Sequence, residues 1–87
     1  MIVTLNEAKK YLRVDYPDED SIIRKFIQTG ETLTEATLRK TITPTKLNKV
    51  AVLYVVGYLF EHREDADMDE VTKNLRYILF ADREAAF

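Results

Sequence analysis

Hydrophobic residues recur along this chain at the spacing of α-helices and not in the strict alternation of β-strands. Between about residues 18 and 40 they form one stripe, made of Ile22, Ile23, Phe26, Ile27, Leu33 and Leu38. A second stripe follows between about residues 69 and 80, with Val71, Leu75, Ile78 and Leu79 on one side. The pattern predicts an amphipathic helix over each of these two ranges.

The most hydrophobic segment lies between these two, at about residues 46–64. Its apolar side chains cover nearly every face of a helix, as expected for a helix surrounded by others. Val52–Val56 is rich in β-branched residues and so also allows a strand, but no turn signal interrupts residues 46–63, which favours a helix. The uncharged run Val50–Phe60 is well short of the ~20 residues that cross a bilayer, so we expect a buried central helix and no membrane contact.

Capping residues mark where the helices begin. Thr4 followed by Glu7 has the spacing of a capping box, which predicts a first helix over about residues 5–12. Pro17 favours a turn, the acidic residues 18–20 suit the start of the second helix, and Thr45 can cap the third. The prediction is an all-α fold, a compact single-domain bundle of about four helices (about 5–12, 18–40, 46–64 and 69–80) with a long central hydrophobic helix, spanning residues 1–87.

The two glycines lie inside predicted helices. Gly30 costs its helix roughly 1 kcal/mol relative to alanine, which indicates either that another helix passes close by or that the helix breaks there. We expect Gly57 to let the second helix approach near Gly30, and Phe60 to anchor the last buried turn of the third helix. Arg63 is placed to bind an acid of residues 15–20 or of a neighbouring subunit.

Composition narrows the possible functions. Eighty-seven residues with 46% hydrophobic content suffice for one domain. The chain contains no cysteine, which excludes disulfides, thiolate zinc sites and cysteine nucleophiles and fits a reducing compartment. A formal net charge of -2 is the wrong sign for a protein that holds nucleic acid by neutralising phosphates. The amino terminus lacks the pattern of a secretory signal.

The segment GYLFEHRED, residues 57–65, holds the only histidine beside several acids. His62 and Glu64 match the H-x-E of zinc deaminases, but the cysteines that complete such a site are missing. Paired carboxylates such as Glu61 and Glu64 are common on the solvated face of a helix. A histidine at the end of a helix more often contacts the helix dipole, so we predict no catalytic residue.

Asp65, Asp67 and Asp69 have the spacing of the first ligands of a calcium-binding EF-hand loop. The sixth position of that loop requires glycine and holds Glu70, and the twelfth requires glutamate and holds Arg76. An acidic loop that caps the next helix is the better interpretation. Because glycine-rich phosphate-binding motifs are also missing, we expect no metal and no cofactor.

The order of motifs resembles the tailed-phage head-to-tail connector family, the gp6-like adaptor or DNA-packaging proteins. The similarity covers about residues 5–64: TLNEAKKYLRVD, then DED, then SIIRKFIQTG, and finally YLFEHRE. The family has Leu-x-x-Ala-Lys-x-x-Leu-Arg at its start and aromatic-Glu-x-Arg-Glu at the end of its central helix. The matching residues are Leu5, Ala8, Lys9, Leu12, Arg13, Asp20, Ile23, Ile27, Phe60, Glu61, Arg63 and Glu64.

This resemblance implies a structural virion protein and no enzyme. Members assemble as rings of about a dozen copies between the portal and the tail-completion (stopper) protein, where the genome passes through the channel without specific binding. The implied location is the head–tail junction of the virion, after assembly in the host cytoplasm. A ring needs two different contact surfaces on each subunit, and the candidates besides Arg63 are Tyr11 and Tyr16 on one side and Tyr77, Phe80 and Phe87 on the other.

Two alternatives remain open from the sequence. A small helix-turn-helix DNA-binding regulator is the first, because Lys46 and Lys49 open the third helix, although that helix is too apolar for a recognition helix. A generic helical protein-interaction module is the second, and it differs from a connector only in its partner.

Overall fold

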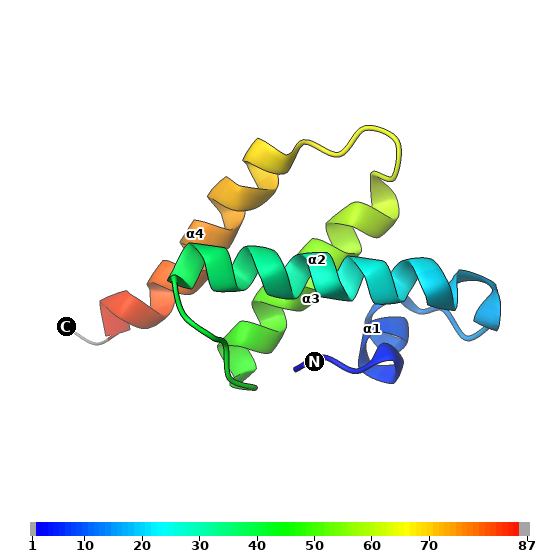
Figure 1. Ribbon diagram of the computed structural model, residues 1–87, viewed down its shortest axis with the longest axis horizontal. Coiled ribbons are helices and arrows are strands. Elements are labelled where there is room, and N and C mark those ends of the chain that lie inside the picture. Colours follow the sequence, from blue (N-terminus) through cyan, green and yellow to red (C-terminus); the bar gives the residue numbers. More distant parts are fainter. Residues whose placement is uncertain (1, 86–87) are drawn as a thin grey trace.

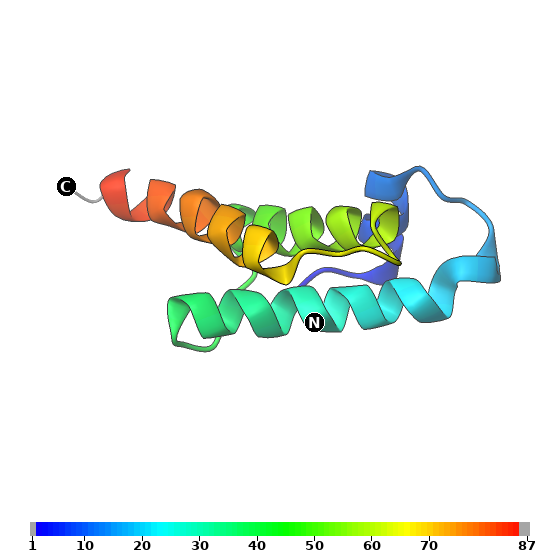
Figure 2. The same cartoon turned by 90° about the horizontal axis from the view of Figure 1, so that it is seen from above.

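The protein folds into two layers of helices. The computed structural model describes residues 2–85, with side chains through residue 80. Over this range there are four α-helices, α1 (Leu5–Leu12), α2 (Asp20–Leu38), α3 (Lys46–Glu61) and α4 (Met68–Ala85), and a 3₁₀ turn, η1 (Pro17–Glu19). One layer is α2, which lies across the others, and the second layer holds α1, α3 and α4 (Figures 1 and 2). The predicted all-α single domain is therefore confirmed.

The helices begin at the residues that the capping pattern indicates. Thr4 and Glu7 form the predicted capping box, in which the Thr4 side chain accepts from the Glu7 backbone N–H and the Glu7 carboxylate accepts from the Thr4 N–H. The Thr45 hydroxyl accepts from the Asn48 N–H at 3.2 Å and so caps α3. The starts of α1 and α3 could thus be predicted from the sequence, because each cap depends on residues only a few positions apart.

The boundaries of α2, α3 and α4 differ from the predicted ones. The acidic segment before α2 forms η1, so α2 begins at Asp20, and α2 ends at Leu38 on a left-handed Arg39 with φ 58°. Arg13 closes α1 in the same conformation, with φ 61°. Each of these residues donates its backbone N–H to the preceding turn, Arg39 to the Glu35 carbonyl at 2.7 Å. α3 ends at Glu61, before the predicted 64, and α4 continues to Ala85, past the predicted 80.

Two groups of buried side chains make up the core. The first lies between α1, α2 and α3 and includes Val3, Ala8, Ile23, Ile27, Val52 and Val56. The second lies between α3 and α4 and includes Ala51, Val55, Leu59, Val71, Leu75 and Leu79. Because α3 contributes side chains to both groups, it connects the halves of the core.

The prediction of a long central helix enclosed on nearly every face is not confirmed. α2, with 19 residues, is longer than α3, with 16. Val50 of α3 remains 46% exposed, and Tyr54 and Tyr58 are only partly buried. The apolar residues of α3 thus exceed what its neighbours cover, which leaves an aromatic strip at the surface.

Carboxylates on α2 hold two irregular segments in place. Glu31 accepts a hydrogen bond from the backbone N–H of Ile2 at 2.7 Å, and Glu35 accepts one from Ile42 at 3.2 Å. Ile42 is thereby buried in the core, although it lies outside any helix. These carboxylates satisfy backbone donors that no helix or sheet could satisfy.

Among the residues with described side chains, three ion pairs connect separate segments of the protein. Lys9 of α1 pairs with Asp20 at 2.7 Å, and Lys49 of α3 pairs with Glu7 of α1 at 3.2 Å. The third pair joins Arg63, which follows the end of α3, to Glu19 of η1. Hydrogen bonds from the Thr4 backbone N–H and then from the Lys49 ammonium hold the pKa of Glu7 below its ordinary value.

Candidate functional site

His62 caps the end of α3. Its ring stacks on Tyr58, with the centroids 4.2 Å apart and the planes 17° from parallel. Its Nδ1–H donates to the Tyr58 carbonyl at 3.0 Å, and its backbone N–H donates to the same carbonyl at 2.9 Å. A carbonyl at the end of a helix needs such donors, so His62 completes the last turn of α3.

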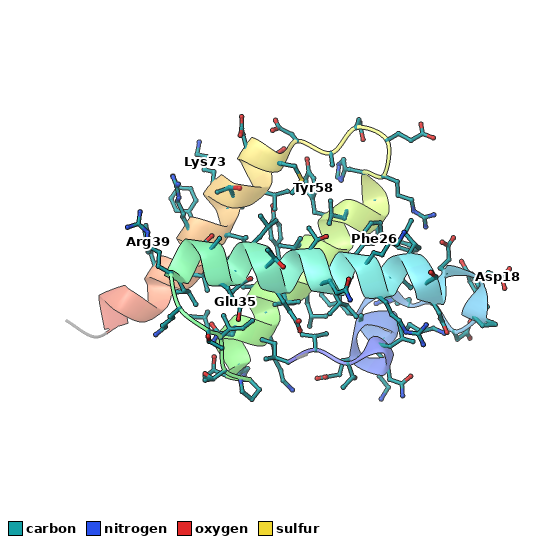
Figure 3. All side chains as sticks on the ribbon, in the orientation of Figure 1. Asp18, Phe26, Glu35, Arg39, Tyr58 and Lys73 are labelled. Atoms are coloured by element: carbon teal, nitrogen blue, oxygen red, sulfur yellow. The ribbon has the colours of Figure 1, made fainter. Side chains whose placement is uncertain are left out.

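The Tyr58 hydroxyl holds the loop between α3 and α4, in the upper part of the molecule as drawn in Figure 3. It accepts from the backbone N–H of Asp67 at 3.0 Å and donates to the Glu70 carboxylate at 3.3 Å. The Asp67 N–H lowers the pKa of Tyr58, but burial and the negative charge of Glu70 outweigh it, so the pKa of Tyr58 is raised. The phenol therefore stays protonated and able to donate.

Asp67 caps α4, as the acidic loop predicts. Its Oδ1 accepts from the backbone N–H of Asp69 at 3.1 Å and of Glu70 at 3.2 Å. The central carboxylate of the EF-hand-like triplet is thus engaged with the protein's own backbone. Among the residues that the structure describes, no group of three or more His, Asp or Glu side chains is placed to hold a metal ion.

Arg63 joins the end of α3 to η1. Its guanidinium pairs with Glu19 at 3.1 Å and lies over the ring of Phe60, 4.5 Å from the centroid. Its Nε–H also donates to the Phe60 carbonyl at 3.3 Å. Of the two predicted partners for Arg63, the acid of residues 15–20 is the one confirmed.

The two glycines contact different helices. A side chain at Gly30 would lie 3.1 Å from the Val52 carbonyl oxygen of α3, so Gly30 does mark the close approach of α2 and α3. A side chain at Gly57 would instead meet the ring of Tyr11, because its Cβ would lie 3.0 Å from the nearest ring carbon. The expectation that Gly57 admits α2 is therefore wrong, because this face of α3 meets α1.

A sequence-family model for "Phage gp6-like head-tail connector protein" matches residues 2–83. The chain belongs to this family. Searches of curated proteins and of solved structures found no match. The family match extends the resemblance past residue 64 and includes most of α4. Connectors of this family are structural components of the phage head–tail junction, which makes the exposed surfaces of the chain the relevant site.

The candidate contact residues of this connector lie in two separate places. Tyr11 and Tyr16, which are 53% and 48% exposed, follow each other at the end of α1 and before η1. Tyr77 and Phe80, which are 67% and 42% exposed, lie on α4. Phe87 is outside the described residues. The structure thus places the described aromatic residues in two groups, one at the end of α1 and in the segment that follows it, and one on α4.

A groove runs along the first of these groups. It lies between the end of α1 and the outer face of α3, and its lining includes Tyr11, Arg13, Tyr54, Tyr58, Phe60 and Glu61. Tyr11, Arg13, Phe60 and Glu61 were named from the sequence. Tyr54 and Tyr58 were not, because they belong to residues 46–64, which were predicted to form a buried central helix. A hint was available, because tyrosine carries a polar hydroxyl that needs a partner, and Tyr54 finds one in the Asn74 amide at 2.7 Å.

No described helix of the connector is both long enough and apolar enough to pass through a bilayer. α3 also does not present the basic outer face of a recognition helix, since Lys49 is paired with Glu7 and Val52 and Val56 are buried.

Proposed function

We propose that this connector is a subunit of an oligomeric ring that joins the portal of the phage head to the tail and extends the DNA channel during head completion. The family match over residues 2–83 carries the proposal. By analogy with other members of the connector family, the ring holds about a dozen copies. Its partners are further copies of the chain, the portal protein and a tail-completion (stopper) protein, and it assembles in the host cytoplasm before it becomes part of the virion.

The separate aromatic groups support a ring. In a cyclic assembly with more than two subunits, each subunit uses one surface toward one neighbour and a different surface toward the other. Tyr11 and Tyr16 belong to the α1 end, and Tyr77 and Phe80 belong to α4. Exposed aromatic residues are enriched at protein interfaces, where they contribute large contact areas at little cost in conformational entropy.

Its charge supports passage of DNA without binding. The formal net charge is -2 and the isoelectric point is about 5.4, so the chain does not gain affinity by releasing counterions from phosphates. A channel formed by such subunits lets the genome slide. If the chain were a DNA-binding regulator, its affinity for duplex DNA would be measurable and would fall steeply as salt rises.

Imaging the pure protein with and without its portal tests the proposal. We expect a monomer or weak oligomer at low concentration, and rings at high concentration or on the portal, because repeated contacts and ring closure strengthen a small interface. Light scattering gives the mass, and electron microscopy gives the shape. Persistence of the monomer at millimolar concentration together with no complex with the portal would contradict a ring connector.

A duplex-DNA titration at several salt concentrations, run on the same preparation, separates the rival interpretations. Tight, salt-sensitive DNA binding by the monomer favours the regulator. Stable binding to a partner other than the portal or the stopper favours a generic interaction module.

A further inference from the structure

Acidic residues are concentrated at one end of the molecule. Segments 15–20 (DYPDED) and 61–70 (EHREDADMDE) consist largely of Asp and Glu, and apart from His62 their one basic side chain is Arg63. The 3.1 Å ion pair between Arg63 and Glu19 holds the two segments together. Glu64 and Asp65 are exposed there and take part in no described hydrogen bond or ion pair. We call this surface the acidic end.

Basic residues are concentrated at the other end. Segments 36–50 and 71–80 contain no acidic residue, and their basic residues are Arg39, Lys40, Lys46, Lys49, Lys73 and Arg76. Figure 3 shows Arg39 and Lys73 on the side of the molecule opposite Asp18, along the longest dimension of 44 Å. Among the described side chains, Arg39 and Arg76 pair with no acid.

A groove lies at this basic end, between the end of α2 and α4. Its lining combines the apolar side chains of Leu33, Ala36 and Phe80 with the guanidinium groups of Arg39 and Arg76. Both arginines are exposed. An apolar surface flanked by planar cations suits a partner that presents carboxylates, because guanidinium groups bind carboxylates in a bidentate geometry. We call this surface the basic groove.

We propose that the basic groove binds the acidic end of a second copy of this chain, so that neighbouring subunits associate head to tail. This inference rests on the proposed ring and names the surfaces that build it. Such a contact brings the opposite charges of the two surfaces together, which guides association and fixes the orientation of the subunits. Duplex DNA is the less suitable occupant, since the acidic end of the same molecule repels it.

The arrangement determines the type of assembly. The two surfaces lie at opposite ends of the folded molecule, so a contact between them is heterologous. Repetition of one heterologous contact gives a closed ring or an open filament. An isologous dimer through either surface would place like charges against each other, which costs binding free energy. Charge complementarity therefore selects a directional contact.

Neutral variants of each surface provide the test. Arg39→Gln with Arg76→Gln removes the cations of the basic groove, and Glu64→Gln with Asp65→Asn removes carboxylates of the acidic end. Arg24→Gln with Lys25→Gln is the matched control, since these exposed basic residues lie on α2 outside the groove. Sedimentation velocity on each protein, alone and in equimolar mixture, measures association, and circular dichroism checks that each variant folds.

We expect each surface variant alone to associate at least ~10-fold more weakly than wild type. The control removes cations beside the acidic end and should associate at least as tightly as wild type does. Each surface variant retains the surface that the other lacks, so a mixture of the two forms pairs and stops at pairs. A nonspecific loss of solubility or folding cannot produce association in the mixture alone. Association of the wild type should also weaken as salt rises from ~50 to ~500 mM.

Different outcomes overturn different claims. If the wild type forms rings and the surface variants form them equally well, the head-to-tail contact is wrong and the ring stands. If the mixture remains monomeric while the wild type assembles, the two surfaces do not face each other. A wild type that is monomeric both alone and with the portal overturns the ring, and the contact with it. If the wild type binds duplex DNA in a salt-sensitive way and the groove variant does not, the groove binds DNA and not a second copy of the chain.

Discussion

On one face of α3, Val52 and Val55 pack against Gly30 of α2, whereas on the opposite face Gly57 meets the ring of Tyr11. The first contact includes a backbone carbonyl oxygen, which cannot move without shifting a helix. The second involves only the end of a side chain that is 53% exposed. Gly30 and Gly57 both lie inside helices, but their surroundings differ. Only Gly30 is required for two helix backbones to pack closely.

The largest expected effect comes from filling the space at Gly30. Gly30→Leu forces α2 away from α3 and should lower the free energy of unfolding by about 3 kcal/mol, at the upper end of what overpacking costs. Gly57→Leu is the matched control and should cost about 1 kcal/mol or less, because Tyr11 can turn toward solvent. Urea denaturation of both variants measures the difference. Equal losses would show that the two faces of α3 are packed alike.

The outer face of α3 depends on hydrogen bonds, and Tyr58 provides the next test. Tyr58→Phe removes the acceptor of the Asp67 N–H and the donor to Glu70, and should cost about 1 kcal/mol. Tyr54→Phe is the control, since its hydroxyl bonds Asn74 in the middle of α4. Hydrogen exchange of the Asp67 amide should accelerate only in Tyr58→Phe. Unchanged exchange in that variant would contradict the role of Tyr58 in holding the loop.

A smaller effect is expected at Arg63, whose ion pair with Glu19 is partly exposed. Solvent screens such a pair, so Arg63→Ala should lower the free energy of unfolding by about 0.5–1 kcal/mol, including the loss of its contact with the Phe60 ring. A double-mutant cycle with Glu19→Gln isolates the ion pair. A coupling energy of zero would mean that Arg63 acts through Phe60 alone.

The smallest expected effect concerns the contact of α3 with α1 through Lys49 and Glu7. Because the pKa of Glu7 is lowered in the folded protein, Glu7 contributes stability above its unfolded-state pKa and loses it as pH falls through the folded-state value. The unfolding temperature, measured between neutral pH and about pH 3, should therefore decrease less steeply with falling pH for Glu7→Gln than for wild type.

Local sequence signals predicted much of this fold. The capping box at Thr4, the Thr45 cap and the cap provided by Asp67 each depend on groups a few residues apart, so their spacing is enough to identify them. In these three caps, chain connectivity already brings the partners together. Arg63 was expected to bind an acid either of residues 15–20 or of a neighbouring subunit, and the packing of the helices selects Glu19.

The rest depended on how the helices are arranged in space. The sequence marks Gly57 as a place without a side chain but does not say which helix lies there, because α1 and α2 are both amphipathic and either could cover α3. For the same reason the groove between α2 and α4 was not predicted, since Arg39 and Arg76 come together only when residues far apart in the chain are packed. Arrangement in space, and not composition, makes these surfaces.

Arg13 and Arg39 have a further consequence for engineering this protein. Each ends a helix with a left-handed backbone, a conformation that costs a residue with a side chain roughly 1 kcal/mol or more and that glycine adopts freely. A designer seeking a more heat-resistant variant would place glycine at both. At position 39 that change also deletes a cation of the basic groove, so the most accessible route to greater thermal tolerance is also a route to a subunit that assembles poorly.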